Sequence, residues 1–410
     1  MYDVLIVGAG PAGSAAAIEL ATAGHQVVVV ERDRLPRPKP CGELLTPRCL
    51  ELVDALGLDA DTLGHRLDHV RLTFDEAGER PRRRSTSVPW PSGTHARVAP
   101  REQFDGALAA RAVALGVELR DGHTAVEPIV ERGFVRGARV TGPDDSAHDV
   151  RATYTLVADG ARSRFGRALG TFREPSWPHA LAHRARYRSA IHDASEAELV
   201  LGLRDRGTPV TGYASMFPRG DGTVNVGVMV LSSSPSFQVI NPARLLDEVV
   251  AEHADGWRLD GPPVDAPAGG RLPLGASVGP QAGPTYLVAG DAAGMANPLG
   301  GTGIEYALAT GRAAAEVLGE AITTGSATAL QRYPRLLDDT HGTYFQVGRL
   351  AVRLFGNPQL STRVGRLAAS RHTTAEAFLR LATNQLRPGW GLAETMYRTG
   401  RALTKIAPSA

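Results

Sequence analysis

Residues 2–32, YDVLIVGAGPAGSAAAIELATAGHQVVVVER, decide the fold class of this 410-residue chain. The short apolar, β-branched runs at residues 3–7 and 26–30 are typical of strands buried in a parallel sheet. The residues between them, Pro11 to Thr22, predict a helix that Gly24 ends. The stretch therefore predicts a βαβ unit, and with it a Rossmann-type α/β fold.

The turn between the first strand and the helix carries a glycine fingerprint. Glycines there allow a tight turn and a close approach of the backbone to a pyrophosphate, which the helix N-terminus stabilises. Glu31 follows the second strand, where a carboxylate can accept hydrogen bonds from a ribose diol. A purely structural glycine turn would leave Glu31 unexplained, so we expect a dinucleotide site here. Its expected residues are Gly8, Gly10, Pro11, Ala12, Gly13, Glu31 and Arg32.

Two later segments repeat this pattern of a strand followed by a turn. Residues 154–160, YTLVADG, end in Asp159 and Gly160, and residues 285–291, TYLVAGD, end in Gly290 and Asp291. The second leads through a glycine-rich turn into a long helix, whose N-terminal amides could face a pyrophosphate or a flavin ring. Asp291 could then hold a ribitol or ribose hydroxyl.

Together and in this order, the three segments resemble the FAD-binding fingerprints of the p-hydroxybenzoate hydroxylase-like flavoproteins. The resemblance reaches from residue 2 to about 318 and implies FAD that is bound non-covalently. Arg101, in RVAPREQFDGAL, falls where that superfamily carries an arginine near the flavin phosphates, although it could also be a solvated charge at a helix start. The resemblance adds to the expected cofactor site Cys41, Gly42, Arg101, Asp159, Gly160, Gly290, Asp291, Pro298, Gly301, Thr302, Gly303 and Ile304.

Residues 39–48, KPCGELLTPR, narrow the resemblance to the geranylgeranyl reductase family, which includes the menaquinone side-chain reductases. Membership implies FAD-dependent reduction of carbon–carbon double bonds in an isoprenoid or polyene substrate. One departure concerns the family pattern Y-x-W-x-F-P, because this chain reads YASMFP and has Ser215 in place of the tryptophan. The substrate pocket is therefore expected to differ from that of the family.

Cys41 and Tyr213 are the candidate catalytic residues. In family members the loop of Cys41 lies near the isoalloxazine ring, where a thiol could donate a proton or form a transient adduct. The alternative is that Cys41 is a small residue filling a tight loop before Gly42. Cys49, the second of only two cysteines, falls at an apparent helix start and is expected in the core. We expect no disulfide, and neither cysteine has the spacing of a metal ligand.

Alternating apolar and polar residues at 65–100 and 175–280 predict an antiparallel sheet, with HVRLTF, HALAHRARYRS and TVNVGVMVL as examples. In the superfamily such a sheet forms the floor of the substrate chamber. The residues expected to line the chamber are Leu45, Tyr213, Ser215, Met216 and Phe217, although ordinary sheet core explains them equally well.

The predicted architecture is thus a Rossmann-type FAD-binding domain interleaved with a substrate sheet. The FAD-binding parts are 1–64, 101–174 and 281–328, the sheet is 65–100 and 175–280, and C-terminal helices occupy 329–410.

Charge and composition limit the partners. The net charge of +2 does not indicate nucleic acid, but residues 341–410 carry ten Lys and Arg against two acids. These helices could lie on an anionic membrane surface or form a solvated cap. No apolar run approaches the ~20 residues that span a bilayer, and no signal peptide is recognisable. We expect a cytoplasmic protein that acts on a lipophilic small molecule, with peripheral contact to the inner face of the cell membrane as the alternative.

Three chemistries remain open on this fold. The first is the isoprenoid or polyene reductase, with reduced nicotinamide or a ferredoxin-type carrier as electron donor. The second is an FAD-dependent monooxygenase of a polyketide or aromatic compound, which Ser215 favours and KPCG disfavours. The third is a non-redox cyclase that keeps FAD as a structural element. A flavin halogenase is disfavoured, because neither of the two lysines, Lys39 and Lys405, is placed for that chemistry and the W-x-W-x-I-P signature is missing.

Overall fold

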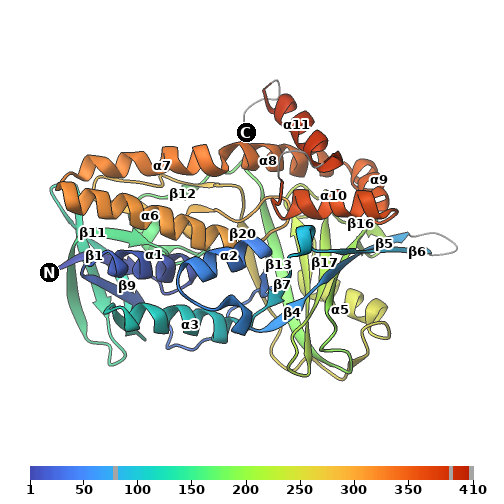
Figure 1. Ribbon diagram of the computed structural model, residues 1–410, viewed down its shortest axis with the longest axis horizontal. Coiled ribbons are helices and arrows are strands. Elements are labelled where there is room, and N and C mark those ends of the chain that lie inside the picture. The colour runs from blue at the N-terminus through green and yellow to red at the C-terminus, as the bar shows by residue number, and fades with distance from the viewer. Residues whose placement is uncertain (77–81, 387–390, 406–410) are drawn as a thin grey trace.

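The computed structural model describes residues 1–76, 82–386 and 391–405. A lobe built on a mixed sheet, with helices along it, lies beside a lobe built on a large antiparallel sheet (Figure 1). The last helices of the chain cover the upper side of both lobes.

The mixed sheet begins with the predicted βαβ unit: β1 (Tyr2–Val7), α1 (Pro11–Thr22) and β2 (Val27–Glu31). The strands run β8-β2-β1-β11-β10-β9, and β22 adds to β11. β1 pairs in parallel with β2 and with β11, so the predicted α/β class is confirmed. The remaining strands are β8 (Glu118–Asp121), β9 (Thr124–Glu131), β10 (Phe134–Thr141), β11 (Ala147–Val157) and β22 (Tyr286–Val288).

Helices α1, α3 (Arg101–Ala114) and α6 (Ile304–Thr324) pack along this sheet. The contact between α1 and α6 is very close, since a Cβ at Gly311 would lie only 2.2 Å from the carbonyl oxygen of Ala12. Glycine at 311 therefore lets the N-terminal halves of both helices reach the same edge of the sheet, where β1 and β22 end.

The antiparallel-type sheet has the strand order β19-β13-β18-β17-β14-β5-β6, with β20 on β13. β13 (His179–Ser189) and β18 (Thr223–Leu231) are the predicted strands HALAHRARYRS and TVNVGVMVL. One neighbouring pair, β5 and β14, is parallel, which the sequence did not predict. The other strands are β5 (His69–Glu76), β6 (Arg82–Pro89), β14 (Glu196–Leu201), β17 (Gly212–Pro218), β19 (Leu259–Asp260) and β20 (Ala268–Pro273).

The two faces of this sheet have different neighbours. One face packs against α5 (Pro242–His253) through valines of β18 and the leucines of the helix. The other face carries Tyr213, Phe217 and Met229 and packs toward the C-terminal helices. A small sheet of β3 (Leu44–Leu45), β7 (Ala96–Val98) and β4 (His65–Leu67) connects the lobes.

The C-terminal region is helical, as predicted: α7 (Arg332–Leu337), α8 (Thr343–Phe355), α9 (Pro358–Ala368), α10 (His372–Ala382) and α11 (Leu392–Thr404). A π-helical turn, Asp338–Gly342, joins α7 to α8. Within the described ranges, no helix combines the length and the hydropathy needed to cross a bilayer.

Candidate functional site

The glycine turn after β1 can be built only from glycine at two positions. Gly8 has a φ of +106°, and a Cβ on it would lie 2.4 Å from the carbonyl oxygen of Ala158. A Cβ at Gly13 would lie 1.9 Å from the oxygen of Gly8. Gly10 differs, because the nearest atom to its Cβ would be 4.0 Å away, on Arg37. The protein itself therefore has room for a side chain at Gly10. A ligand that approaches the backbone closely explains the glycine at this position.

The carboxylate of Glu31 is held at this turn. It accepts hydrogen bonds from the backbone N–H of Ala9 (2.8 Å) and of Asp33 (3.0 Å), and Arg37 lies 3.4 Å away. Glu31 is thus buried and fixed beside the glycines, as the ribose role requires. Arg32, expected in the same site, is largely exposed and pairs with its neighbour Asp33 at 3.2 Å.

The second and third segments meet this turn at the same edge of the sheet. Gly290 packs against α1, since a Cβ on it would lie 2.9 Å from that of Ala12. Gly303 caps the start of α6 beside the Asp291 carboxylate, which would lie 3.2 Å from a Cβ at Gly303. Both α1 and α6 begin after a glycine and have no side-chain cap, so their first amides remain available to an anion or a polar ring.

Two polar atoms at this edge fit a bound cofactor. The hydroxyl of Thr302 and one carboxylate oxygen of Asp159 are buried without a hydrogen-bond partner. Buried polar atoms are nearly always hydrogen-bonded in native proteins, so these two are open to hydrogen bonds with a polar ligand. Together with the glycine turn, the fixed Glu31 and two open helix N-termini, they make a donor and acceptor set that fits FAD.

Pro298 is placed differently from the rest of the third segment. Its ring lies against α8, where a Cβ at Gly348 would come within 2.3 Å of it. Its contacts in the structure are therefore with the C-terminal helices, which it ties to the turn before α6. Gly301, three residues on, has a φ of +65° and borders Met229 and the Tyr213 hydroxyl.

The Cys41 loop lies between the two lobes. The Cys41 sulfur accepts from the backbone N–H of Glu43 (3.3 Å), and its carbonyl accepts from the side-chain amide of Asn225 (2.9 Å). A Cβ at Gly42 would lie 3.2 Å from the ring of Phe217 on β17. Cys41 is half-buried, whereas Cys49 is buried in α2 (Pro47–Ala55), as predicted.

Sequence reasoning did not identify the ion pair that anchors this loop. Glu43 has a φ of +66°, and its carboxylate pairs with Arg219 at 2.9 Å and accepts from Asn225 at 3.1 Å. Both partners of the ion pair are 2% exposed, so the charges compensate each other out of water. Asn225 stands between two valines of the otherwise largely apolar strand β18, a signal that the sequence did contain.

Arg101 faces this loop from the start of α3. It makes two hydrogen bonds to Asp105, at 2.9 and 2.7 Å, and Arg37 also reaches Asp105 at 3.1 Å. Burial works to lower the pKa of Arg101, but the nearby Asp105 carboxylate and Cys41 outweigh it and raise the pKa. Arg101 is therefore buried and fully charged, so the idea of a solvated helix-start charge is wrong.

Tyr213, Ser215 and Phe217 share the face of β17 that is directed toward the Cys41 loop and the turn before α6. The Tyr213 hydroxyl donates to the carbonyl oxygen of Gly300 at 2.8 Å. Burial, with a smaller contribution from Cys41, raises the pKa of Tyr213 to about 12. Ser215 lies opposite Gly227 on β18, and a Cβ at Gly227 would lie 3.3 Å from the serine hydroxyl.

Two expected lining residues are placed elsewhere, and those predictions are wrong. Met216 points to the opposite face of the sheet, where it is fully buried against the α5 side, because side chains alternate along a strand. Leu45 is fully buried in the core of the mixed-sheet lobe. The apolar neighbours of Tyr213 and Phe217 that the sequence did not identify are Leu44, Leu199 and Phe378.

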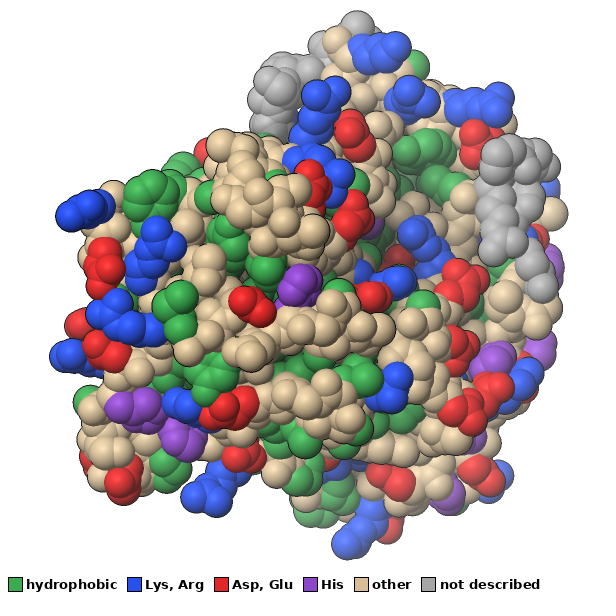
Figure 2. All heavy atoms as spheres, turned by 60° about the vertical axis from the view of Figure 1, so that its left-hand side comes forward, with side chains coloured by type: hydrophobic (Ala, Val, Ile, Leu, Met, Phe, Trp, Pro, Cys, Tyr) green, Lys and Arg blue, Asp and Glu red, His purple; other side chains and the backbone are tan. Residues whose placement is uncertain are grey.

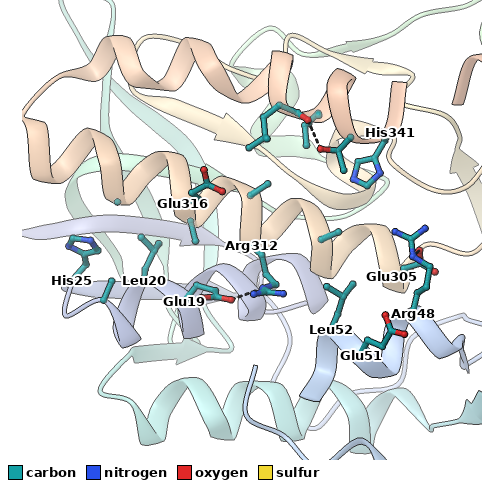
Figure 3. A pocket seen from close by; sticks show the side chains of 18 of the residues that line it. Glu19, Leu20, His25, Arg48, Glu51, Leu52, Glu305, Arg312, Glu316 and His341 are labelled. Atoms are coloured by element: carbon teal, nitrogen blue, oxygen red, sulfur yellow. Dashed lines mark hydrogen bonds and ion pairs between the residues drawn. The ribbon is translucent and has the colours of Figure 1, made fainter. Parts of the chain in front are cut away.

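A groove of about 930 Å³ lies on the outer side of the mixed-sheet lobe, along α1, α2 and α6 (Figure 3). Its side chains include Glu305, which pairs with Arg48 at 3.4 Å, and His341 from the π-helical turn. None of the expected cofactor residues is among the residues that line this groove. The groove is therefore distinct from the glycine cradle.

Asp75, Glu252 and His253 bring possible metal ligands within 4.8 Å of one another. Arg83 already donates to Asp75 at 2.7 Å and lies 3.3 Å from the His253 ring. A guanidinium thus supplies the positive charge that a metal would bring.

Comparison with known proteins covers nearly the whole chain. The family described as "FAD binding domain" matches residues 1–208. The chain is 33% identical over 392 residues to menaquinone reductase of Mycolicibacterium smegmatis, which covers 93% of this chain and 91% of that protein. It is 32% identical over 353 residues to digeranylgeranylglycerophospholipid reductase 1 of Methanopyrus kandleri, which covers 85% and 89%.

The solved structures agree on the fold. A geranylgeranyl bacteriochlorophyll reductase-like protein from Thermoplasma acidophilum superposes with a TM-score of 0.79 at 24% identity, covering 96% of this chain and 99% of that one. A flavin-dependent brominase superposes with a TM-score of 0.72 at 20% identity, covering 99% and 98%. The fold alone is thus shared with other flavin chemistry, whereas the full-length sequence similarity is to reductases. The chain belongs to the geranylgeranyl reductase family of FAD-dependent oxidoreductases.

Proposed function

We propose that this protein reduces carbon–carbon double bonds in the isoprenoid chain of a lipid, with the side chain of a menaquinone-type molecule as the first substrate to test. The observation that carries the proposal is the full-length similarity to menaquinone reductase and to digeranylgeranylglycerophospholipid reductase. These two substrates share a long isoprenoid chain and differ in the headgroup. The isoprenoid chain is therefore the part of the substrate on which we expect this protein to act.

Saturating an alkene needs a hydride at one carbon and a proton at the other. FAD, once bound and reduced, supplies the hydride. The protein has to hold the chain, exclude water and deliver the proton. Cys41 is the proposed proton donor, because its loop lies at the junction of the cradle and the substrate sheet. Tyr213 is the second candidate; burial raises its pKa to about 12, which makes its hydroxyl a weaker acid than that of a free tyrosine.

The substrate face of β17 supports an apolar, elongated ligand. Tyr213 and Phe217 pack with Leu44, Leu199 and Phe378 in one apolar cluster. Between the two rings, Ser215 stands opposite Gly227. We propose that this pair of small residues makes room for the isoprenoid chain where the family carries a tryptophan, and that Ser215 thereby sets which chain is accepted.

The electron donor and the location of the protein are part of the same proposal. We propose a reduced nicotinamide or a ferredoxin-type carrier that binds transiently, because the sequence has no second complete glycine fingerprint for a nicotinamide. We also propose that the C-terminal helices contact the cytoplasmic face of a membrane, where an isoprenoid lipid is dissolved. Exposed leucines and arginines on these helices support this contact.

The test is anaerobic turnover followed by mass spectrometry. The quinone ring of a menaquinone itself accepts electrons from a reduced flavin, so flavin colour cannot decide between ring and chain. A prenyl alcohol without a quinone ring should therefore be supplied alongside the menaquinone. The expected product gains two hydrogens for each double bond reduced, and only when the flavin has been reduced.

Other outcomes identify the competing chemistries. Oxygen-dependent incorporation of an oxygen atom would make the protein a monooxygenase and contradict the proposal. Conversion of a polyene at constant mass with the flavin oxidised throughout would make it a cyclase.

A further inference from the structure

Lys39 is a charged residue near the cradle that the site described above does not use. It opens the KPCG loop and is one of only two lysines in the chain. Its ammonium nitrogen lies 3.9 Å from the position that a Cβ would take on Gly160, the glycine that follows β11. The loop backbone is tied to the substrate sheet, since Arg184 donates to the carbonyl oxygen of Lys39 at 3.5 Å. Lys39 therefore extends from the Cys41 loop to the second FAD segment.

Its ammonium group has no partner of its own. Within residues 1–76, 82–386 and 391–405, it makes neither an ion pair nor a hydrogen bond. The arginines around it are different, because Arg101 and Arg37 both pair with Asp105. Of Lys39, Arg37 and Arg101, Lys39 is thus the one that has no carboxylate within ion-pair distance.

The charges around Lys39 explain why an anion would be favoured there. Burial lowers the pKa of Lys39, and so does the positive charge of Arg101, while Asp291 and Asp105 raise it. An ammonium that is partly removed from water next to another cation is stabilised strongly by an added negative charge. These neighbours belong to different segments of the FAD site: Arg101 to α3, Asp291 to the turn after β22 and Gly160 to the turn after β11.

We propose that Lys39 binds the pyrophosphate of FAD and closes the cradle from the side of the KPCG loop. The pyrophosphate is the group of FAD with a permanent negative charge, and the cation beside the glycine turn before α1, Arg37, is already paired with Glu31 and Asp105. Lys39 would supply a cation that is not yet paired. The inference depends on FAD binding and not on which alkene is reduced, so it can fail while the reductase proposal stands.

The first experiment uses the holoenzyme of Lys39→Met, with Lys39→Arg and Lys405→Met as matched variants. Phosphorus NMR of the bound FAD should show the two pyrophosphate resonances shifted in Lys39→Met and unchanged in Lys405→Met. After dilution, the fluorescence of released FAD should appear about 10- to 100-fold faster in Lys39→Met, the range expected for one charged hydrogen bond. Lys39→Arg, which keeps the charge, should release FAD at close to the wild-type rate.

The second experiment uses the scarcity of lysine. Reductive methylation of the wild-type holoenzyme should modify Lys405 rapidly and Lys39 slowly, as peptide mass spectrometry would show. Methylation of both lysines at equal rates would overturn the proposal. So would unshifted phosphorus resonances in Lys39→Met, even with faster FAD release, because the lysine would then act on the loop and not on the pyrophosphate.

Discussion

Cys41 is the side chain on which the proposed proton transfer depends. Cys41→Ser should keep FAD bound and reducible, because serine is close in size and still accepts from the Glu43 N–H. Alkene turnover should fall by roughly 10²- to 10⁴-fold, the usual effect of losing a general acid, since a serine hydroxyl is a far weaker acid than a thiol. Anaerobic product formation measured by mass spectrometry checks this.

Cys49→Ser is the matched control. Cys49 lies in the core with 1% of its surface exposed, and burial raises the pKa of its thiol. The substitution Cys49→Ser should therefore have little effect on turnover. Normal turnover by Cys41→Ser would remove the thiol from the chemistry and leave Tyr213 as the candidate donor. Loss of FAD from Cys41→Ser would instead show that the thiol packs beside the cofactor.

Two glycines of the first turn should respond differently to substitution. Gly13→Ala places a methyl group 1.9 Å from the Gly8 oxygen, so it should lower the melting temperature and yield protein without FAD. Gly10→Val meets only the end of Arg37, so it should leave the melting temperature of the apoprotein nearly unchanged and still abolish FAD binding. Flavin absorbance and thermal unfolding separate these effects. Full flavin occupancy in Gly10→Val would show that the pyrophosphate does not approach this turn.

At the scale of elements, the buried pair of Glu43 and Arg219 joins the Cys41 loop to the substrate sheet. Glu43→Gln leaves Arg219 without its main counter-charge, and breaking such a pair usually costs about 3–5 kcal/mol. The double variant Glu43→Gln with Arg219→Met should recover part of this loss, because no buried charge remains unpaired. The free energy of unfolding in urea, measured for the wild type, Glu43→Gln, Arg219→Met and the double variant, gives the coupling energy.

An exposed pair provides the control for this cycle. Arg139 and Asp149 lie 3.2 Å apart in solvent on β10 and β11, so Asp149→Asn should change the stability by less than about 1 kcal/mol. If Glu43→Gln also lowered the stability by less than about 1 kcal/mol, the anchoring role of the buried pair would be contradicted.

The π-helical turn between α7 and α8 makes stability depend on pH. Burial, and to a smaller extent Arg48, lowers the pKa of His341 from 6.5 to about 4. The folded protein therefore keeps this ring neutral while the unfolded chain protonates it. Stability is retained above pH 6.5 and falls as the pH drops toward 4, by up to roughly 1.4 kcal/mol per pH unit for this group.

His341→Gln should flatten this dependence between pH 6.5 and 4, as urea midpoints at several pH values would show. His69, an exposed histidine on β5, is the control, and His69→Gln should leave the slope unchanged. Equal slopes in all three proteins would contradict a neutral, buried His341.

The elements also show what the sequence could predict. The glycine turns and the strands next to them are local signals, because a close backbone approach requires glycine within a few residues. The predictions of chamber-lining residues are wrong at Met216 and Leu45. Successive side chains of a strand point to opposite faces of the sheet, and these two residues point to the face away from the expected chamber. The anchoring of Cys41 depends on Arg219 and Asn225, which are about 180 residues away, and no local pattern encodes that contact.

For the whole molecule, the fold narrows the chemistry without deciding it. The same arrangement of lobes occurs in a flavin-dependent brominase, at 20% identity. The reductase proposal therefore depends on the full-length similarity to the reductases and on the Cys41 loop, and not on the shared framework.

The C-terminal helices combine two roles that an experiment has to separate. Their inner side is part of the fold, since Asn297 bonds to the Tyr344 hydroxyl at 3.1 Å and to the Ala382 carbonyl at 2.9 Å. Deleting residues 341–410 would therefore destabilise the protein whatever it binds. Their outer side carries basic side chains, which gather over the top of the molecule in Figure 2. It also carries exposed apolar residues: Leu354, Leu360, Leu367, Leu392, Met396 and Leu403.

Surface substitutions test the membrane contact without disturbing the core. Leu360 and Leu367 are seven residues apart and lie on one face of α9, so Leu360→Ser with Leu367→Ser should weaken binding to anionic vesicles. Replacing the exposed Arg353, Arg363 and Arg371 by Gln should cost about 1 kcal/mol of binding free energy for each charge. That loss should shrink at high salt, because attraction to the surface is screened over ~10 Å at 0.1 M. Vesicle co-sedimentation at two salt concentrations measures both effects.

Val130→Ser, an exposed apolar position on β9 in the mixed-sheet lobe, is the control and should bind vesicles like the wild type. If the α9 and arginine variants also bind like the wild type, the C-terminal helices are a solvated cap, and the isoprenoid chain has to reach Cys41 by another route.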